Sequence, residues 1–234
     1  MTLLLPRPAR TVADEIAGGL AGGRGLRLVN YHSTPRRRAA EYARQIAALA
    51  QDHVPFRRED LDAWTGGAIA TGARPPLMPV LFEGFRDNAE VLLPLLEAAG
   101  FTGWFVLPSH FPNVPAAGQR AFAAAHRLHY DIDDYPGKRI VMTWAEMRAI
   151  ADRGHVFACH SRTHAALTPD TPDAVLHDQI VTAKQEMQDG LGREVDIFCW
   201  LHGAETGLNP RADALLRAAG YRYLLSNFRL QRLQ

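Results

Sequence analysis

Two histidines four residues apart follow a short apolar run in the second half of the chain. They bound the stretch HSRTH, His160 to His164, which comes directly after VFAC. A turn of helix brings side chains four residues apart to one face, where two imidazoles can hold one cation about 2.0–2.1 Å from each nitrogen. The spacing alone is a weak signal. Its position after an apolar run, with a carboxylate at the end of another run, favours a metal site.

Polar residues also stand where other apolar runs end. His32 follows LRLVNY, Glu83 follows PVLF, and His110 closes FVLPSH. His160 and His202 close HVFACH and DIFCWLH in the same way. Because the carboxyl ends of parallel strands meet at one edge of a sheet or barrel, we expect these five side chains on one face.

The elements that must position these residues alternate along the chain. Amphipathic segments with helical spacing separate short apolar runs, and several end at a glycine, such as Gly100 and Gly154. The predicted strands are LRLVNYH, PPLMPVLF, TGWFVLPSH, HVFACH, VDIFCWLHG and YRYLLSNF. This order predicts βαβ units and a parallel sheet. We therefore expect an α/β fold, a barrel or partial barrel, with residues 26–234 as one domain after an N-terminal extension, residues 1–25.

Composition limits the classes of partner. The 234 residues are 47% hydrophobic, and their net charge of +1 gives no electrostatic case for nucleic acid or an anionic membrane. No run of about 20 apolar residues could span a bilayer. The start, MTLLLPRPAR, has too short an apolar core for a signal peptide. We expect a soluble, cytoplasmic protein without nucleic-acid or membrane partners, and the sequence indicates no oligomeric state.

The remaining cysteines and histidines are interpreted as structural. Cys159 and Cys199 stand inside apolar runs, so we expect buried thiols rather than a disulfide. His155 precedes its strand and is expected on the opposite rim. The other histidines fall in helices or loops: His53, His126, His129 and His177.

Together these motifs resemble the polysaccharide deacetylases of carbohydrate esterase family 4, in order from about Leu26 to Asn227. The resemblance is greatest to a subgroup with a tyrosine–histidine strand near its start, matched here by Tyr31 and His32. LFEGFRDN is similar to the family's first motif, T-F-D-D-G-Y-R-D-N. The H-S-x-T-H motif is complete in this chain and is the most specific of these marks.

The resemblance implies a distorted (β/α) barrel with a divalent metal, often zinc, held by one aspartate and two histidines. A second aspartate would activate water to attack an N- or O-acetyl carbonyl. Carried over by position, His160 and His164 are metal ligands and His32 is the general acid. The backbone N–H of His202 stands where the family places an oxyanion donor.

The aspartate pair of the first motif is absent. Aligned without a gap, its positions hold Phe82 and Glu83; with one deletion, Glu83 stands for one or both acids. Glu83 is thus the expected metal ligand or base. The His202 imidazole, or the Glu205 carboxylate, could contribute in place of the missing acid. Asp87 is interpreted as a structural acid near a helix start.

Three functions stay open at this point. The first is a metal-dependent hydrolase that removes an acetyl group from a soluble carbohydrate or small amide. The second is a hydrolase of the same fold acting on a non-carbohydrate C–N bond. The third is a catalytically impaired descendant that binds a sugar or a partner. The intact histidine pair favours the first function, and the missing aspartate favours the third.

Overall fold

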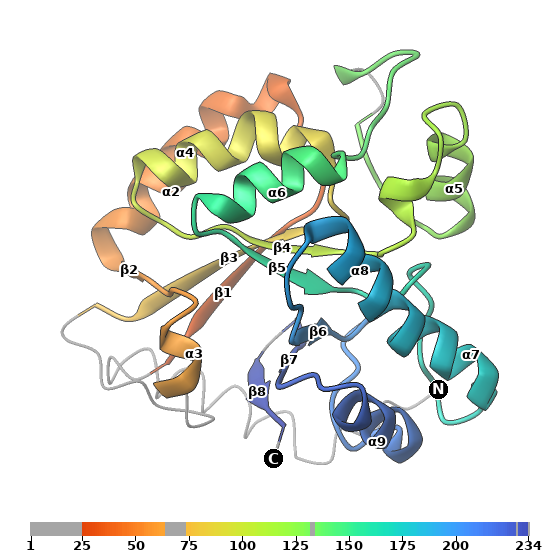
Figure 1. The fold of residues 1–234 in the computed structure, drawn as a ribbon. Helices are drawn as coiled ribbons and strands as arrows, with labels where there is room; N and C mark the ends of the chain where they lie inside the picture. The colour runs from red at the N-terminus through yellow and green to blue at the C-terminus, as the bar shows by residue number, and fades with distance from the viewer. Residues whose placement is uncertain (1–24, 64–73, 132–133, 228, 234) are drawn as a thin grey trace.

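The computed structural model describes residues 25–63, 74–131, 134–227 and 229–233. A mostly parallel sheet curls into a half-barrel with helices outside it (Figure 1). The predicted α/β fold of distorted-barrel type is confirmed. Most of the predicted N-terminal extension, residues 1–24, lies outside the described residues, so the domain boundary stays a prediction.

The sheet has the strand order β1-β3-β4-β5-β6-β7-β8, with β2 beside β3. Every pair is parallel except β7 and β8, which are antiparallel. The strands are β1 (Arg27–Tyr31), β2 (Val54–Pro55), β3 (Pro76–Phe82), β4 (Trp104–Leu107), β5 (Val156–Cys159), β6 (Ile197–Cys199), β7 (Tyr223–Leu225) and β8 (Leu230–Arg232). Six of them match the predicted runs. The other two, β2 and β8, were not predicted from the sequence.

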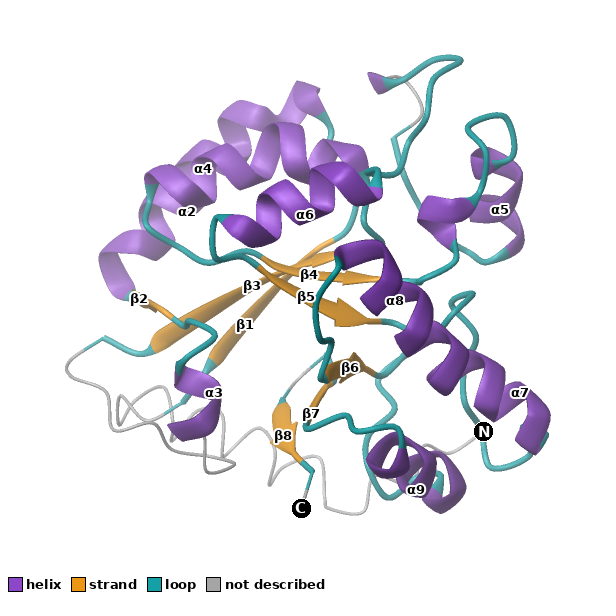
Figure 2. Cartoon of the chain, in the orientation of Figure 1, coloured by secondary structure: helices purple, strands orange, loops and turns teal. Residues whose placement is uncertain are grey.

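Helices fill the connections between the parallel strands. α2, α4 and α6 cover one face of β1, β3, β4 and β5, while α7, α8 and α9 lie beside the later strands (Figure 2). The helices are α2 (Ala39–Asp52), α3 (Asp60–Ala63), α4 (Leu93–Ala98), α5 (Gln119–Ala125), α6 (Trp144–Asp152), α7 (Asp173–His177), α8 (Ala183–Leu191) and α9 (Pro210–Ala218). Short 3-10 turns are η1 (Arg36–Arg38) and η3 (Phe111–Asn113). Two π-helical turns, η2 (Asn88–Leu92) and η5 (Asp178–Thr182), lead into α4 and α8.

Local sequence signals explain where several helices begin and end. Thr143 and Glu146 form a capping box at the start of α6, in which each side chain meets the backbone of the other. Asn209 caps α9 and Pro210 takes its first position, where a missing N–H costs nothing. Gly192 ends α8 in a left-handed conformation.

The core divides into two clusters, one on each face of the sheet. On β3, Leu77 and Leu81 pack with the outer helices. Met78, Val80 and Phe82 instead face the inside of the half-barrel. This is the period of two expected of a strand that is buried on both faces. The polar residues at the strand ends therefore rest on a fully buried scaffold.

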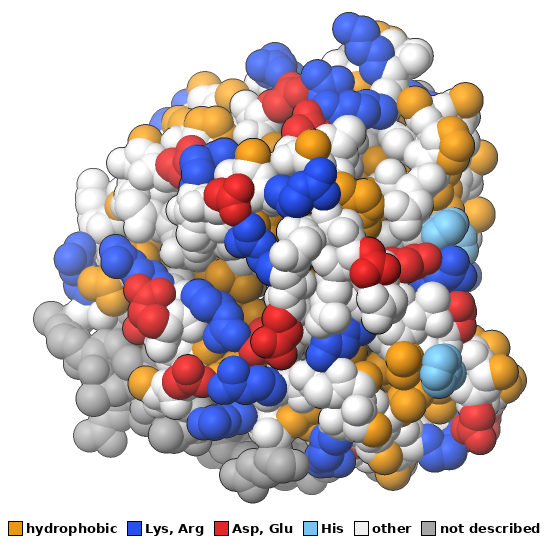
Figure 3. Space-filling model, in the orientation of Figure 1, with side chains coloured by type: hydrophobic (Ala, Val, Ile, Leu, Met, Phe, Trp, Pro, Cys, Tyr) orange, Lys and Arg blue, Asp and Glu red, His pale blue; other side chains and the backbone are white. Residues whose placement is uncertain are grey.

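The surface of the molecule carries mixed charges. Figure 3 shows basic and acidic side chains interspersed over one face of the molecule. Within the described residues, no helix has the length and apolar character needed to cross a membrane. Both cysteines are free and buried, as the sequence predicts.

Candidate metal centre

Three predicted ligands meet at the carboxyl ends of β3 and β5. Glu83, His160 and His164 each offer a ligand atom, and these atoms lie within 4.8 Å of one another. Nε2 of His164 is 3.3 Å from Oε1 of Glu83, and the two side chains are 9% and 3% exposed. The prediction that these residues lie together is confirmed by their geometry.

The backbone around this group adopts left-handed conformations that residues other than glycine rarely take. Glu83 has φ 71°, Ser161 has φ 62°, His164 has φ 60° and His202 has φ 53°. Such conformations persist only where the surrounding structure imposes them, and they concentrate at functional sites. At Glu83 the left-handed turn ends the alternation of β3, which would otherwise direct residue 83 toward the helix layer.

Both histidines are held in one tautomer. Nδ1 of His160 lies 2.9 Å from the carbonyl oxygen of Cys199, and Nδ1 of His164 lies 2.8 Å from that of His126. Because a carbonyl oxygen only accepts hydrogen bonds, each Nδ1 donates its proton. Nε2 of His160 keeps a lone pair, whereas Nε2 of His164 faces the Glu83 carboxylate and would release its proton to bind a cation. Metal-binding histidines are commonly oriented by such a bond at the other ring nitrogen.

The protonation states suit a cation. Burial lowers the pKa of His160 to about 4, so this ring is neutral at pH 7. Burial also acts to lower the pKa of His164, but the hydrogen bond and charge of Glu83 outweigh it, so this pKa is raised. Burial acts to raise the pKa of Glu83, but the hydrogen bond from His164 and the charges of the nearby histidines lower it overall. An ionised, buried Glu83 therefore faces the two imidazoles.

Glu83 has one further feature that fits a metal ion. Its Oε2 atom is buried and has no hydrogen-bond partner among the described residues. A buried carboxylate oxygen without a partner is costly. Two imidazole nitrogens and a carboxylate are also a common protein donor set for zinc. The residues present thus fit a divalent cation.

The two other predicted site residues flank this group. The His32 ring stacks on Phe82, with centroids 5.0 Å apart and planes 13° apart. The His202 ring stands edge-on to His164, with centroids 5.6 Å apart. Burial is the main cause that lowers the pKa of His32, and likewise that of His202. Both residues retain an exposed surface, so they border the group from the solvent side.

Phe82 occupies space beside the metal ligands. Its ring contacts His160 edge-on, with centroids 5.4 Å apart, as well as stacking on His32. It belongs to the inner apolar cluster and is 4% exposed. An apolar ring therefore lies where the gap-free alignment would place the first acid of the motif.

Two further polar residues lie outside the group. His110 is at the end of β4, but its ring pairs with Glu186 at 3.5 Å. Glu205 accepts a hydrogen bond from Ser226 and lies 3.4 Å from Arg229. Glu205 is thus engaged by these two residues, and among the described residues it does not belong to the group that could hold a metal ion.

Asp87 has the structural role expected of it. Its Oδ2 atom accepts hydrogen bonds from Ser33 Oγ at 2.5 Å and from Thr34 N at 2.9 Å. These bonds attach the segment after β1 to the start of η2. Burial raises the pKa of Asp87 to about 6.

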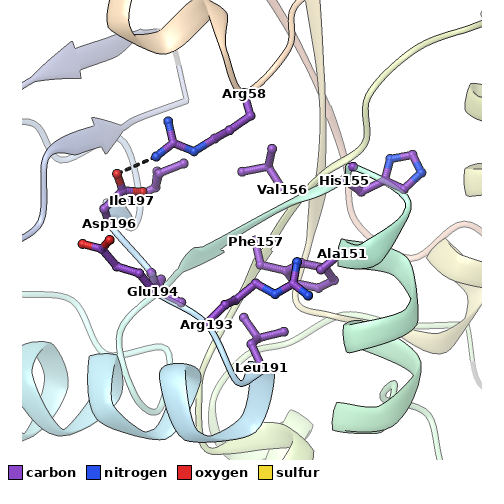
Figure 4. Close-up of a pocket in the computed structure, with 12 residues that line it drawn as sticks. Arg58, Ala151, His155, Val156, Phe157, Leu191, Arg193, Glu194, Asp196 and Ile197 are labelled. Carbon is purple, nitrogen blue, oxygen red and sulfur yellow. Dashed lines mark hydrogen bonds and ion pairs between the residues drawn. The ribbon is translucent and has the colours of Figure 1, made fainter.

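The opposite rim of the sheet has a different character. His155 stands before β5, where Nδ1 accepts from Gly103 N at 2.9 Å and Nε2 lies 3.0 Å from Glu97. A cavity of about 230 Å³ opens beside it. Arg58 and Asp196 form a 2.6 Å ion pair across this cavity (Figure 4). His155 therefore lies on the opposite rim, as predicted, where it links the segments before β4 and β5 by hydrogen bonds.

Comparison with models of known protein families shows which family the chain belongs to. Residues 84–224, more than half of its length, match the family model of polysaccharide deacetylase. This chain belongs to the polysaccharide deacetylase family. The matched range contains His160, His164 and His202 and begins one residue after Glu83. A search of curated proteins finds no match.

Solved structures of deacetylases share the fold of this family member. IcaB from Ammonifex degensii is 16% identical, over 88% of this chain and 87% of its own, with a TM-score of 0.63. The deacetylase PplD of Streptococcus pyogenes, solved in complex with acetate, is 11% identical over 84% and 79%, with a TM-score of 0.60. The BpsB deacetylase domain from Bordetella bronchiseptica is 18% identical over 91% and 89%, with a TM-score of 0.58.

Two supporting side chains of this deacetylase-family site were missed by the sequence analysis. Asn88 Nδ2 donates to the carbonyl of Phe82 at 3.0 Å, directly before Glu83. Gln179 contacts the loop between the two histidines. Both are amides on a buried helix face, and a polar residue within an apolar stripe is the signal that could have found them. The backbone carbonyl of His126, which orients His164, could not have been found from the sequence, because every residue has a backbone carbonyl.

Proposed function

We propose that this chain is a metal-dependent hydrolase that removes an N- or O-linked acetyl group from a carbohydrate or a small amide. The observation that carries the proposal is the convergence of Glu83, His160 and His164, in which backbone carbonyls engage both Nδ1 atoms and leave the Nε2 atoms to bind a cation. Membership of the polysaccharide deacetylase family supports hydrolytic deacetylation as the reaction.

Glu83, His160 and His164 would hold the cation, and zinc is the ion that their nitrogen and carboxylate donors favour. When bound, such a cation acidifies water and polarises the carbonyl of the acetyl group. Glu83 is assigned as a ligand because its carboxylate already faces His164 at 3.3 Å. A single carboxylate in that position is poorly placed to act as base as well.

Proton transfer then falls to the two flanking histidines. His32 and His202 both keep pKa values below the ordinary imidazole value, so they are neutral at pH 7 and able to accept a proton. We assign His32 to accept the proton that the attacking water loses and to return it to the leaving amine or alcohol. The backbone N–H of His202 is assigned to the developing oxyanion. Water and the acetylated substrate thus yield acetate and a free amine or hydroxyl.

A second candidate is favoured by one specific observation. Phe82 lies where the family resemblance implies a base, and its ring is packed against His32 and His160. A chain of this kind could retain a metal and bind an acetylated sugar without hydrolysing it. A C–N hydrolase acting on a non-carbohydrate amide is the remaining alternative.

Acetate release separates these candidates. Zinc-loaded protein would be incubated with N-acetylglucosamine oligosaccharides, O-acetylated sugars and small acetamides, and acetate would be measured enzymatically. The proposal expects acetate from at least one class and none from His164→Ala. Retained zinc with no acetate from any substrate, together with measurable sugar binding, would support the binding protein instead.

A further inference from the structure

The loop from His160 to His164 carries two of the three candidate ligands on a strained backbone. Ser161 and His164 both have left-handed conformations, and neither is a glycine. A loop of this kind does not hold its shape by local preference. Its surroundings must fix it, since His164 reaches Glu83 only if the loop turns back toward β3.

Gln179 makes the central contact with this loop. Its side-chain oxygen accepts hydrogen bonds from Arg162 N at 3.1 Å, Thr163 N at 3.0 Å and Thr163 Oγ1 at 3.2 Å. Gln179 is 5% exposed, so water offers these groups little alternative. One oxygen thus gathers three donors from the two residues that immediately precede His164.

The helix that carries Gln179 is distorted at this residue. Gln179 lies in the π-helical turn η5, between α7 and α8. A π turn adds a residue to the helix, a feature that occurs mostly at functional sites. The distortion coincides with the point where the helix faces the loop, and it sets which side chain reaches the loop.

A second set of contacts holds the same loop through the side chain of Arg162. Its guanidinium donates to Glu186 at 2.9 Å and to Asp178 at 3.2 Å. Glu186 also accepts from Ser109 Oγ at 2.7 Å. Asp178 and Glu186 lie on the same helical segment as Gln179, so both sets of contacts hold the loop from one element.

We propose that Gln179 is a positioning residue of the candidate metal centre: its side-chain oxygen fixes the backbone of Arg162 and Thr163 so that His164 faces Glu83. The part of this inference that concerns metal rests on the proposed function. The part that concerns the loop is a property of the metal-free chain.

Zinc affinity tests the inference, measured by competition with a chromogenic chelator at a temperature at which every variant is folded. Gln179→Met removes the acceptor at similar volume and is expected to weaken zinc binding about 10- to 100-fold, as is typical for partners that orient metal ligands. Gln179→Glu retains an acceptor oxygen and is expected to restore most of the affinity. Thr163→Val, a milder change, is expected to weaken it less, and it keeps the test valid if Gln179→Met does not fold.

Gln188→Met is the matched control. Gln188 lies on α8, and its side-chain oxygen accepts from Val195 N at 3.3 Å, before β6. Losing this bond also disturbs a helix–loop contact, but at a distance from His160 and His164. Its zinc affinity is expected to equal that of the wild type. Equal affinities of Gln179→Met and Gln188→Met would overturn the inference.

Amide hydrogen exchange in zinc-free protein gives a readout that needs no metal. The amides of Arg162 and Thr163 are expected to exchange faster in Gln179→Met than in the wild type or Gln188→Met. Exchange at the wild-type rate would overturn the inference. A wild-type chain that retains no zinc would instead contradict the proposed function, and the exchange of the two amides would then decide alone whether Gln179 holds the loop.

Discussion

Nε2 of His164 lies 3.3 Å from Oε1 of Glu83, and Nδ1 of the same ring lies 2.8 Å from the carbonyl oxygen of His126. The imidazole is thus held from both sides. Each contact comes from a different part of the chain, and together they turn the ring toward His160. This arrangement makes the group a candidate metal centre rather than three separate polar residues.

The first prediction concerns the interaction between Glu83 and His164 in zinc-free protein. The carboxylate raises the pKa of His164 against the effect of burial. Glu83→Gln keeps the size of the side chain but removes its charge, so the pKa of His164 should fall. Titration of the ring protons by NMR measures this change, with Glu205→Gln as a control at another buried glutamate. A His164 titration that is the same in Glu83→Gln and wild type would mean that the two groups do not interact.

The second prediction concerns metal content. Tag-free protein, purified without chelator, exposed to zinc and then desalted, should retain about one equivalent of zinc by inductively coupled plasma mass spectrometry. His160→Ala should lose it, because the neutral lone pair directed by Cys199 is removed. His177→Ala is the matched control, since His177 is exposed on α7. Zinc that stays bound to His160→Ala would place the metal elsewhere.

The third prediction concerns the dependence of stability on pH at Asp87. Its pKa is about 6 in the folded chain, against 3.8 for an unperturbed aspartate. Between these pH values the folded state binds more protons than the unfolded state, so the contribution of Asp87 to stability falls as pH rises through this window. At pH 7.5 the ionised, buried carboxylate costs on the order of 2 kcal/mol.

Asp87→Asn removes this charge and keeps an oxygen for Ser33 and Thr34. The variant should gain stability relative to wild type at pH 7.5, by on the order of 2 kcal/mol, and gain little at pH 4. Urea denaturation at both pH values measures the two differences. An equal difference at pH 4 and pH 7.5 would show that the carboxyl group does not titrate between them.

The fourth prediction concerns the packing of α6 against α8. A Cβ atom at Gly190 would lie 2.3–2.5 Å from three atoms of the Trp144 ring. Alanine normally stabilises a helix relative to glycine by about 0.5–1 kcal/mol. Here overpacking should reverse the sign, and Gly190→Ala should destabilise the chain by about 1–3 kcal/mol in urea denaturation.

A double-mutant cycle isolates this contact. In a Trp144→Leu background the substitution at Gly190 should cost less, because the smaller side chain leaves room for the methyl group. A penalty of the same size in both backgrounds would mean that Trp144 is not the cause.

The sequence determined the alternation of elements and the positions of the polar residues. Short apolar runs separated by amphipathic segments predict parallel strands and outer helices. A strand buried on both faces is apolar throughout, whereas an outer helix is apolar only on the face that packs on the sheet. His160 and His164 were recognisable as a pair because they follow a strand at a spacing that suits one cation. Glu83 was recognisable as the carboxylate that stands at the end of another strand.

Only the tertiary structure decided which of the strand-end residues meet. His110 looked equivalent to the other strand-end residues in sequence, but its ring pairs with Glu186. Glu205, in the loop after the β6 run, pairs with Arg229. Such pairings join segments far apart in the chain, so no local pattern encodes them. The left-handed backbone at Glu83 and His164 has the same origin, since residues of this type adopt it only where distant contacts impose it.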